Sequence, residues 1–83
     1  MNNTITQYEY RVLQTQYTIQ GRTYTVYGIS VYEQAFDNSP IALVRKVPNI
    51  SLSMSRVADL VERCNRLQPS PIHLDDIIED FLP

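Results

Sequence analysis

Glycine, cysteine and tryptophan are scarce in this chain of 83 residues, which has two, one and none of them. Neither glycine opens a segment with helical periodicity, so no glycine-rich loop of the phosphate-binding kind is present. The single cysteine, Cys64, cannot form a disulfide within the chain. With one histidine beside it, the chain also offers too few soft ligands for a zinc site. We therefore expect no metal and no cofactor.

Long apolar runs are also missing. No stretch approaches the ~18 apolar residues that cross a membrane as a helix. Residues 1–4 lack the basic region and the apolar stretch of a secretory signal. We therefore expect a cytoplasmic protein that does not bind a membrane.

Only Cys64 and His73 suggest a nucleophile and a base, which would have to lie within hydrogen-bonding reach of each other. The spacing places Cys64 on the apolar side of a helix, where a thiol is usually an inert small hydrophobe. We therefore expect structural roles for both residues and no enzymatic activity.

What the chain does contain is a long β-rich segment, residues 5–34, interrupted only by Gln20-Gly21, which suits a two-residue hairpin turn. Pairing the residues that flank this turn places Tyr17 opposite Tyr24 on one side of the ribbon. The same register places Tyr10 opposite Val31 on the other side, so the apolar face switches along the hairpin. We expect a bend or bulge at the switch, around Gly28, and curvature explains it better than an approaching ligand.

After a turn cluster at residues 35–40, residues 41–47 form a compact apolar segment that predicts a third strand ended by Pro48. A helix over 53–67 follows, capped by one of three serines, with apolar residues at helical spacing at Met54, Val57, Ala58, Val61, Cys64 and Leu67.

Ser70-Pro71 then predicts a cap and first turn for a closing helix over 71–82. Its apolar stripe comprises Leu74, Ile77, Ile78 and Phe81. We expect one α+β domain spanning residues 1–83, a three-stranded antiparallel β-meander followed by two α-helices packed on one face.

The closing segment is acidic. Residues 70–83 carry four carboxylates and no Lys or Arg, whereas residues 1–69 carry seven bases and five acids. Glu79 and Asp80 also lie near the negative end of the helix dipole, where carboxylates are unfavourable. Asp75, Asp76, Glu79 and Asp80 therefore either form a solvated helix face or bind a partner with a basic surface.

All six tyrosines lie on the hairpin, more than a core of this size buries easily. They either line the edges of the sheet and helices or contact a protein. If tyrosines contact a protein, we expect Tyr8, Tyr10, Tyr27 and Tyr32 to do so. We expect a non-catalytic protein-protein interaction module, such as a regulator or a mobile-element-encoded inhibitor of a host protein. The alternative is a small nucleic-acid-binding protein using the Tyr/Arg-bearing sheet, which the net charge of −2 and dispersed arginines disfavour.

A homodimer is a further expectation, because a three-stranded sheet has two edges.

Two motifs carry a resemblance to a known family. They are the hairpin segment YTVYGI at residues 24–29 and the closing segment SPIHLDDIIEDFL at residues 70–82. The chain resembles a family of short, uncharacterised proteins, a domain of unknown function found mainly in clostridia and related Gram-positive bacteria. The similarity covers residues 8–82 or so, and it implies a bacterial setting without assigning a role to any residue.

Overall fold

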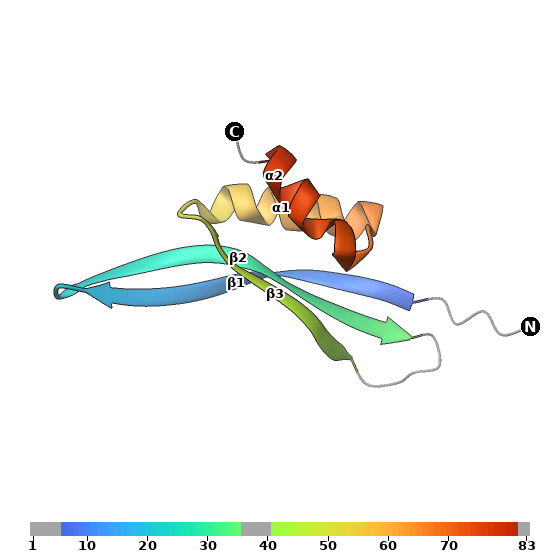
Figure 1. The fold of residues 1–83 in the computed structure, drawn as a ribbon, viewed down its shortest axis with the longest axis horizontal. Coiled ribbons are helices and arrows are strands. Elements are labelled where there is room, and N and C mark those ends of the chain that lie inside the picture. The colour runs from blue at the N-terminus through green and yellow to red at the C-terminus, as the bar shows by residue number, and fades with distance from the viewer. Residues whose placement is uncertain (1–5, 36–40, 82–83) are drawn as a thin grey trace, which may run out of the picture.

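The computed structural model describes residues 6–35 and 41–81. Three antiparallel strands, β1 (Thr6–Ile19), β2 (Arg22–Ala35) and β3 (Ala42–Ser51), form one sheet in the order β1-β2-β3. They are followed by α1 (Met54–Leu67), the short 3-10 helix η1 (Pro71–His73) and α2 (Leu74–Phe81). Both helices lie on one face of the sheet (Figure 1). The predicted α+β meander with two helices is confirmed.

The hairpin has the register that alternation and the turn predict. Pairing runs without a shift from Ile19 opposite Arg22 to Thr6 opposite Ala35. Gln20 and Gly21 both have positive φ, 51° and 76°, which matches the twist of a two-residue hairpin turn. Side chains therefore alternate strictly between a covered face, which packs on the helices, and an open face, which does not.

The core lies between the covered face and the helices. It contains Tyr10, Ile29 and Val31 from the sheet, Val57, Leu60, Val61 and Cys64 from α1, and Leu74 and Ile78 from α2. The predicted stripe of α1 was wrong at its ends, because Met54 and Leu67 are 56% and 66% exposed. Leu60, which the prediction omitted, is fully buried and completes an i, i+3, i+4, i+7 pattern from Val57 to Cys64.

Only half of the hairpin is covered. β3 pairs with β2 from Glu33 to Tyr27 and no further. The remaining part, residues 13–26, which we call the arm, projects beyond both helices as a two-stranded ribbon (Figure 1). No arm residue is buried. The molecule is accordingly long, with principal extents of 57 × 27 × 18 Å.

The irregularity expected at Gly28 lies on the β3 side of β2. Ile29 pairs with Val47 but Tyr27 pairs with Ser51, so three residues of β3 bulge opposite Gly28. A Cβ at Gly28 would collide with the Val47 carbonyl oxygen and stand 2.8 Å from the Pro48 Cα. The bare glycine therefore admits the neighbouring strand rather than a ligand. The predicted end of the third strand at residue 47 was wrong, because an edge strand tolerates proline at a bulge and then continues.

The helix termini confirm one predicted cap and correct another. The Ser53 hydroxyl accepts a hydrogen bond from the Arg56 N–H (3.4 Å) at the start of α1. Ser70 makes no such side-chain bond, and its carbonyl oxygen accepts from the His73 N–H at 2.9 Å instead. Residues 71–73 consequently form a 3-10 turn, and the closing α-helix begins at Leu74 rather than at residue 71.

Candidate functional site

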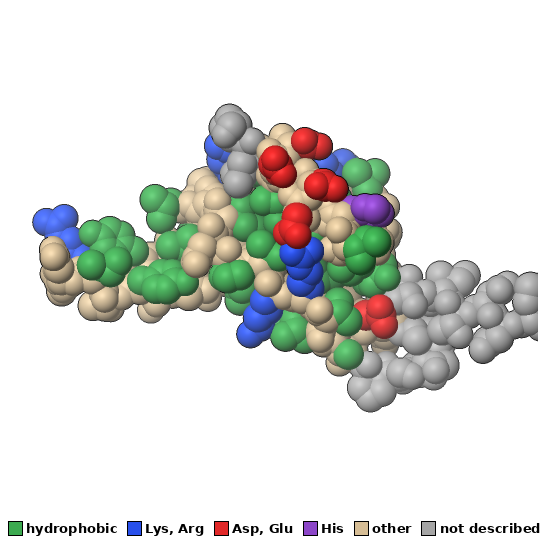
Figure 2. Space-filling model, viewed as in Figure 1, with side chains coloured by type: hydrophobic (Ala, Val, Ile, Leu, Met, Phe, Trp, Pro, Cys, Tyr) green, Lys and Arg blue, Asp and Glu red, His purple; other side chains and the backbone are tan. Residues whose placement is uncertain are grey.

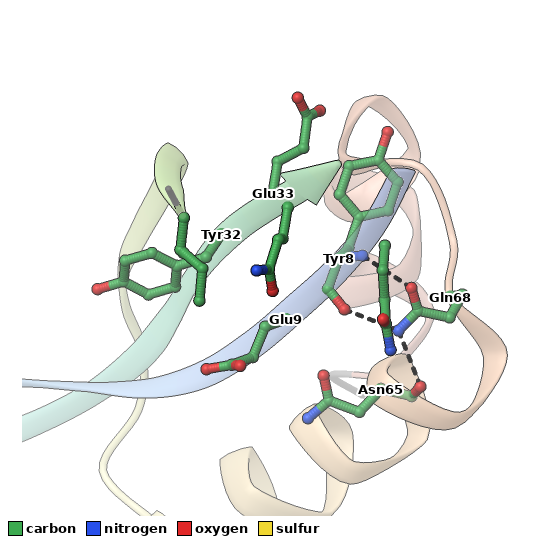
Figure 3. Close-up of a pocket in the computed structure, with 9 residues that line it drawn as sticks. Tyr8, Glu9, Tyr32, Glu33, Asn65 and Gln68 are labelled. Carbon is green, nitrogen blue, oxygen red and sulfur yellow. Dashed lines mark hydrogen bonds between the residues drawn. The ribbon is translucent and has the colours of Figure 1, made fainter. Parts of the chain in front are cut away.

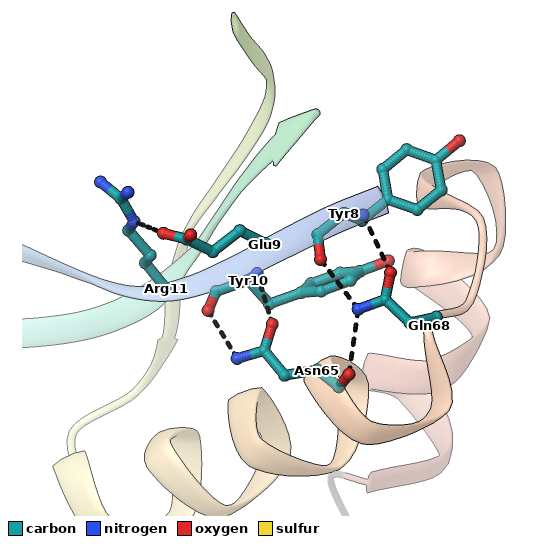
Figure 4. A network of polar contacts seen from close by, with 6 residues as sticks. All are labelled: Tyr8, Glu9, Tyr10, Arg11, Asn65 and Gln68. Carbon is teal, nitrogen blue, oxygen red and sulfur yellow. Dashed lines mark hydrogen bonds and ion pairs between the residues drawn. The ribbon is translucent and has the colours of Figure 1, made fainter. Parts of the chain in front are cut away.

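Two side-chain amides, one from α1 and one from the residue that caps its C-terminal end, bind the outer edge of β1. Asn65 accepts from the Tyr10 N–H (2.7 Å) and donates to the Tyr10 carbonyl (2.9 Å). Gln68 makes the same pair of bonds with Tyr8, at 2.9 and 2.8 Å. Gln68 caps α1 in the left-handed conformation, with φ of 54°. The two amides thus act as a substitute strand over two alternate residues of β1, which we call the amide clamp (Figure 4).

The structure separates the four tyrosines predicted to bind a partner. Tyr10 is 1% exposed and its hydroxyl donates to the Pro69 carbonyl. Burial raises the pKa of Tyr10 to about 12. Tyr10 is therefore a core residue, and its assignment to a partner surface was wrong because the register fixed its face but not what covers it. Tyr8 and Tyr27 are half-buried and pack against the core.

Tyr32 is the one predicted tyrosine that lies on the open face, directly opposite Glu9. The Arg11 guanidinium stands 4.3 Å from the centre of its ring. Arg11 also forms an ion pair with Glu9, and its hydrogen bond to that carboxylate raises its pKa. This cationic group is therefore engaged within the protein.

A cavity of about 230 Å³ lies between β1, β2 and the C-terminal end of α1, with Ile41, the residue before β3, also in its lining (Figure 3). Its labelled lining residues are Tyr8, Glu9, Tyr32, Glu33, Asn65 and Gln68. The two amides are already used by the clamp, and Glu9 is paired with Arg11. Within residues 6–35 and 41–81, no group of three or more His, Cys, Asp or Glu gathers that could hold a metal ion. The cavity is therefore lined mainly by polar side chains, with Tyr8 and Tyr32 among them.

The acidic helix also divides into two parts. Asp75 forms an ion pair with Arg45 at 2.6 Å, and Arg45 also donates to the Pro71 carbonyl at 2.9 Å. This pair joins β3 to the start of α2, so Asp75 has a structural role. Asp76, Glu79 and Asp80 are exposed, and acidic side chains gather over α2 (Figure 2).

The arm carries three exposed large apolar or aromatic residues that the predicted partner surface left out. Tyr17, Tyr24 and Ile19 are 39%, 43% and 59% exposed. All three lie on the open face, beside half-buried Leu13 and Val26. The Tyr17 hydroxyl donates to Asn49 Oδ1 at 2.8 Å, which ties the arm to the β3 bulge. Apolar side chains are visible along the arm in Figure 2.

A signal for the arm was present in the sequence. Strands rise about 3.4 Å per residue and helices about 1.5 Å, so a helix of equal residue number covers less than half of a strand. β1 and α1 both have 14 residues. The tip of so long a hairpin therefore had to extend beyond the helix.

Cys64 and His73 lie in different surroundings. Cys64 is buried in the core, and this burial raises the pKa of its thiol, whereas His73 is exposed. A raised pKa lowers the fraction of reactive thiolate at neutral pH. Cys64 thus has the features of a packing residue.

These observations define a small α+β domain in which two helices cover half of a long hairpin and leave its tip exposed. The chain belongs to the Family of unknown function (DUF6514), whose model matches residues 1–83. The resemblance to an uncharacterised family is thereby confirmed. No curated protein and no solved structure matches the chain. No helix among the described residues is long and apolar enough to span a bilayer.

Proposed function

We propose that this protein is a non-catalytic interaction module that binds another protein through the open face of its arm. The observation that carries the proposal is the exposure of Tyr17, Ile19 and Tyr24 on a ribbon that neither helix covers in the described part of the chain. Tyrosine provides a large amphipathic contact area and loses little conformational entropy on binding, which makes it common in protein interfaces. A projecting ribbon can also enter a concave surface of a partner.

The exposed carboxylates of α2 provide a second contact for a partner with a basic surface. Asp76, Glu79 and Asp80 contribute to it, whereas Asp75 is paired with Arg45. Charges at the rim of an interface speed association more than they strengthen it. The arm therefore supplies the affinity in this proposal, and the acidic helix orients the encounter.

The biological role we assign to this module is regulation or inhibition of a host protein, in a bacterial cytoplasm. The bacterial setting rests on the resemblance to proteins of clostridia and related Gram-positive bacteria. Nucleic-acid binding ranks second, because Arg11 is paired with Glu9 and Arg45 with Asp75. Of the cations near the open face, this leaves mainly Arg22 at the tip of the arm and Lys46 of β3 exposed.

The test compares two double variants in capture experiments from host lysate. Ile19→Ser/Tyr24→Ser removes apolar surface from the arm, and the control Leu67→Ser/Ile72→Ser removes apolar side chains elsewhere that are more exposed than these two. We expect the arm variant to lose the proteins captured by the wild type and the control variant to keep them. Retention of the same proteins by the arm variant would refute the proposal.

A heparin column provides the check on the alternative. A protein that contacts phosphates through Lys and Arg is retained on heparin at low salt, and its binding weakens steeply as the salt concentration rises. We expect the wild type to pass through at physiological salt. Strong retention that is lost in an Arg22→Gln variant would favour nucleic acid over protein as the partner.

A further inference from the structure

The outer edge of β1 is blocked at one end and free along the arm. The clamp bonds show that the N–H and C=O groups of Tyr8 and Tyr10 point outward, away from β2. β1 pairs with β2 without a register shift from Thr6 to Ile19, so this parity continues along the strand. Since the strand period is two, Val12, Gln14, Gln16 and Thr18 also direct their backbone groups outward.

β1 is an edge strand, and within the described residues only the clamp covers its outer side. Residues 12–18 have the sequence VLQTQYT, with no charged residue, proline or glycine. Natural edge strands usually carry lysine, proline or a bulge that prevents pairing with another chain. This segment has none of these protections, whereas the neighbouring residues 8–10 are closed by two dedicated side chains.

The geometry points to a second copy of this chain as the occupant of the free edge. We propose that β1 pairs antiparallel with β1 of the second copy about a two-fold axis at Thr15. The available segment is bounded by the clamp at Tyr10 and by the turn at Gln20, and Thr15 is its midpoint. Antiparallel pairing about that midpoint uses the whole free edge in both copies, and pairing about any other residue uses less of it.

This register is self-complementary. Val12 faces Thr18 of the second copy and Gln14 faces Gln16, all with outward backbone groups, which gives about eight inter-chain hydrogen bonds. On the open face, Leu13 lies opposite Tyr17 of the second copy, a favourable aromatic-aliphatic cross-strand pair. No like charges meet, because the segment is uncharged.

The inference goes beyond the proposed function and does not depend on it. Pairing through β1 joins two three-stranded sheets into one continuous sheet. It leaves the open faces of both arms uncovered and brings them side by side, so the exposed tyrosines of two copies form one larger surface. Such a closed isologous dimer has no free β1 edge left to recruit further chains.

The experiment measures the mass of the purified protein by sedimentation equilibrium from low to high micromolar concentration. We expect the mass to rise from 9.6 kDa toward twice that value. Gln14→Lys/Gln16→Lys places like charges opposite each other across the interface, and we expect it to raise the dimer dissociation constant about tenfold or more. Gln14→Lys/Gln16→Glu places opposite charges there instead, and we expect a dissociation constant equal to or below that of the wild type.

A proline pair tests the edge itself. Gln14→Pro removes an outward N–H that β2 does not use, so the hairpin survives and dimerisation is lost. Thr23→Pro removes an outward N–H from the opposite edge of the arm and serves as the matched control, with dimerisation kept. Melting curves at low concentration verify that each variant is folded.

A wild type that stays at 9.6 kDa at every concentration would overturn the proposal. So would a dimer that Gln14→Pro and the like-charge variant leave unchanged, because it would have to use another surface. These readouts contain no partner protein, so their failure is distinct from failure of the capture experiment.

Discussion

The covered half of the hairpin and the arm are built from the same two strands and from similar residues, yet they differ in almost every physical respect. In the covered half, β1 lies beneath α1 and is closed at its edge by Asn65 and Gln68, while β3 flanks β2. In the arm, no residue is buried, and no other strand among residues 6–35 and 41–81 pairs with either edge. Tyr10 and Tyr24 therefore have opposite environments, 1% and 43% exposed. The position of the covering elements, more than strand composition, decides which tyrosines are core.

The largest effect is expected where the covered half is packed most tightly. Leu60 is fully buried, and Leu60→Ala should lower the free energy of unfolding by about 2–5 kcal/mol because it leaves a cavity. Ile19→Ala in the arm should change it by no more than about 0.5 kcal/mol. Urea unfolding of both variants measures the difference. Equal losses would show that the arm is as strongly coupled to the core as α1 is.

The boundary between the two regions depends on Gly28. Gly28→Ala should cost about 1–3 kcal/mol, because the added methyl group overlaps the backbone of the β3 bulge. Gly21→Ala provides the contrast, since a Cβ added at position 21 has nothing within 4 Å. The cost of this substitution comes only from the backbone φ of 76°. Asparagine tolerates positive φ, so Gly21→Asn should be more stable than Gly21→Ala. Gly28→Asn should be no more stable than Gly28→Ala. Rescue at both positions in thermal melts would mean that the bulge gives way easily.

The amide clamp is the next target. Asn65→Leu removes both bonds to the Tyr10 backbone and should cost about 1–2 kcal/mol. Glu62→Ala, at an exposed site on the same helix, is the control and should cost no more than about 0.5 kcal/mol. Hydrogen exchange of the Tyr10 amide should accelerate only in the first variant. Unchanged exchange would show that the clamp does not protect the edge.

The smallest effects are expected on the acidic helix. Asp75→Asn weakens the pair with Arg45 and should cost at most about 1 kcal/mol, because the Asp75 side chain is 68% exposed. Glu79→Gln/Asp80→Asn should leave stability unchanged or raise it by a few tenths of a kcal/mol, since the acidic groups oppose the helix dipole. Melting curves of the Asp75→Asn and Glu79→Gln/Asp80→Asn variants at low and high salt measure both effects. A large loss in the double variant would give these acids a structural role.

The class of fold, the strand pairing and the burial of Cys64 could be predicted from the sequence, because a two-residue turn and an alternating pattern fix register and face. The sequence could not predict which part of each face becomes buried, because that depends on the position of α1 along the sheet. For this reason Tyr10 was misassigned, and Tyr17 and Tyr24 were left out of the candidate surface. The end of β3 was missed because a bulge lets the strand continue past Pro48.

The candidate site shows the same limit at the level of single side chains. Asn65 and Gln68 have no local sequence pattern that predicts their bonds, because the backbone groups they bind are 55 and 60 residues away. The pair between Arg45 and Asp75 is equally remote, at 30 residues. Contacts of this kind arise from tertiary packing alone. The lengths of the predicted elements carried a usable signal. A helix of 14 residues is less than half as long as a strand of 14 residues and cannot cover it.

The long sequence separation of the clamp has a consequence for the order of events during folding. The strands and their tight turn involve neighbouring segments and can form early, whereas Asn65 and Gln68 reach β1 only after α1 has docked across the sheet. During synthesis on a ribosome, the edge at Tyr8 and Tyr10 therefore remains unprotected until the end of α1 has emerged. The nascent chain passes through an interval in which the whole of β1 is open to other strands, and docking of α1 reduces that exposure to the arm.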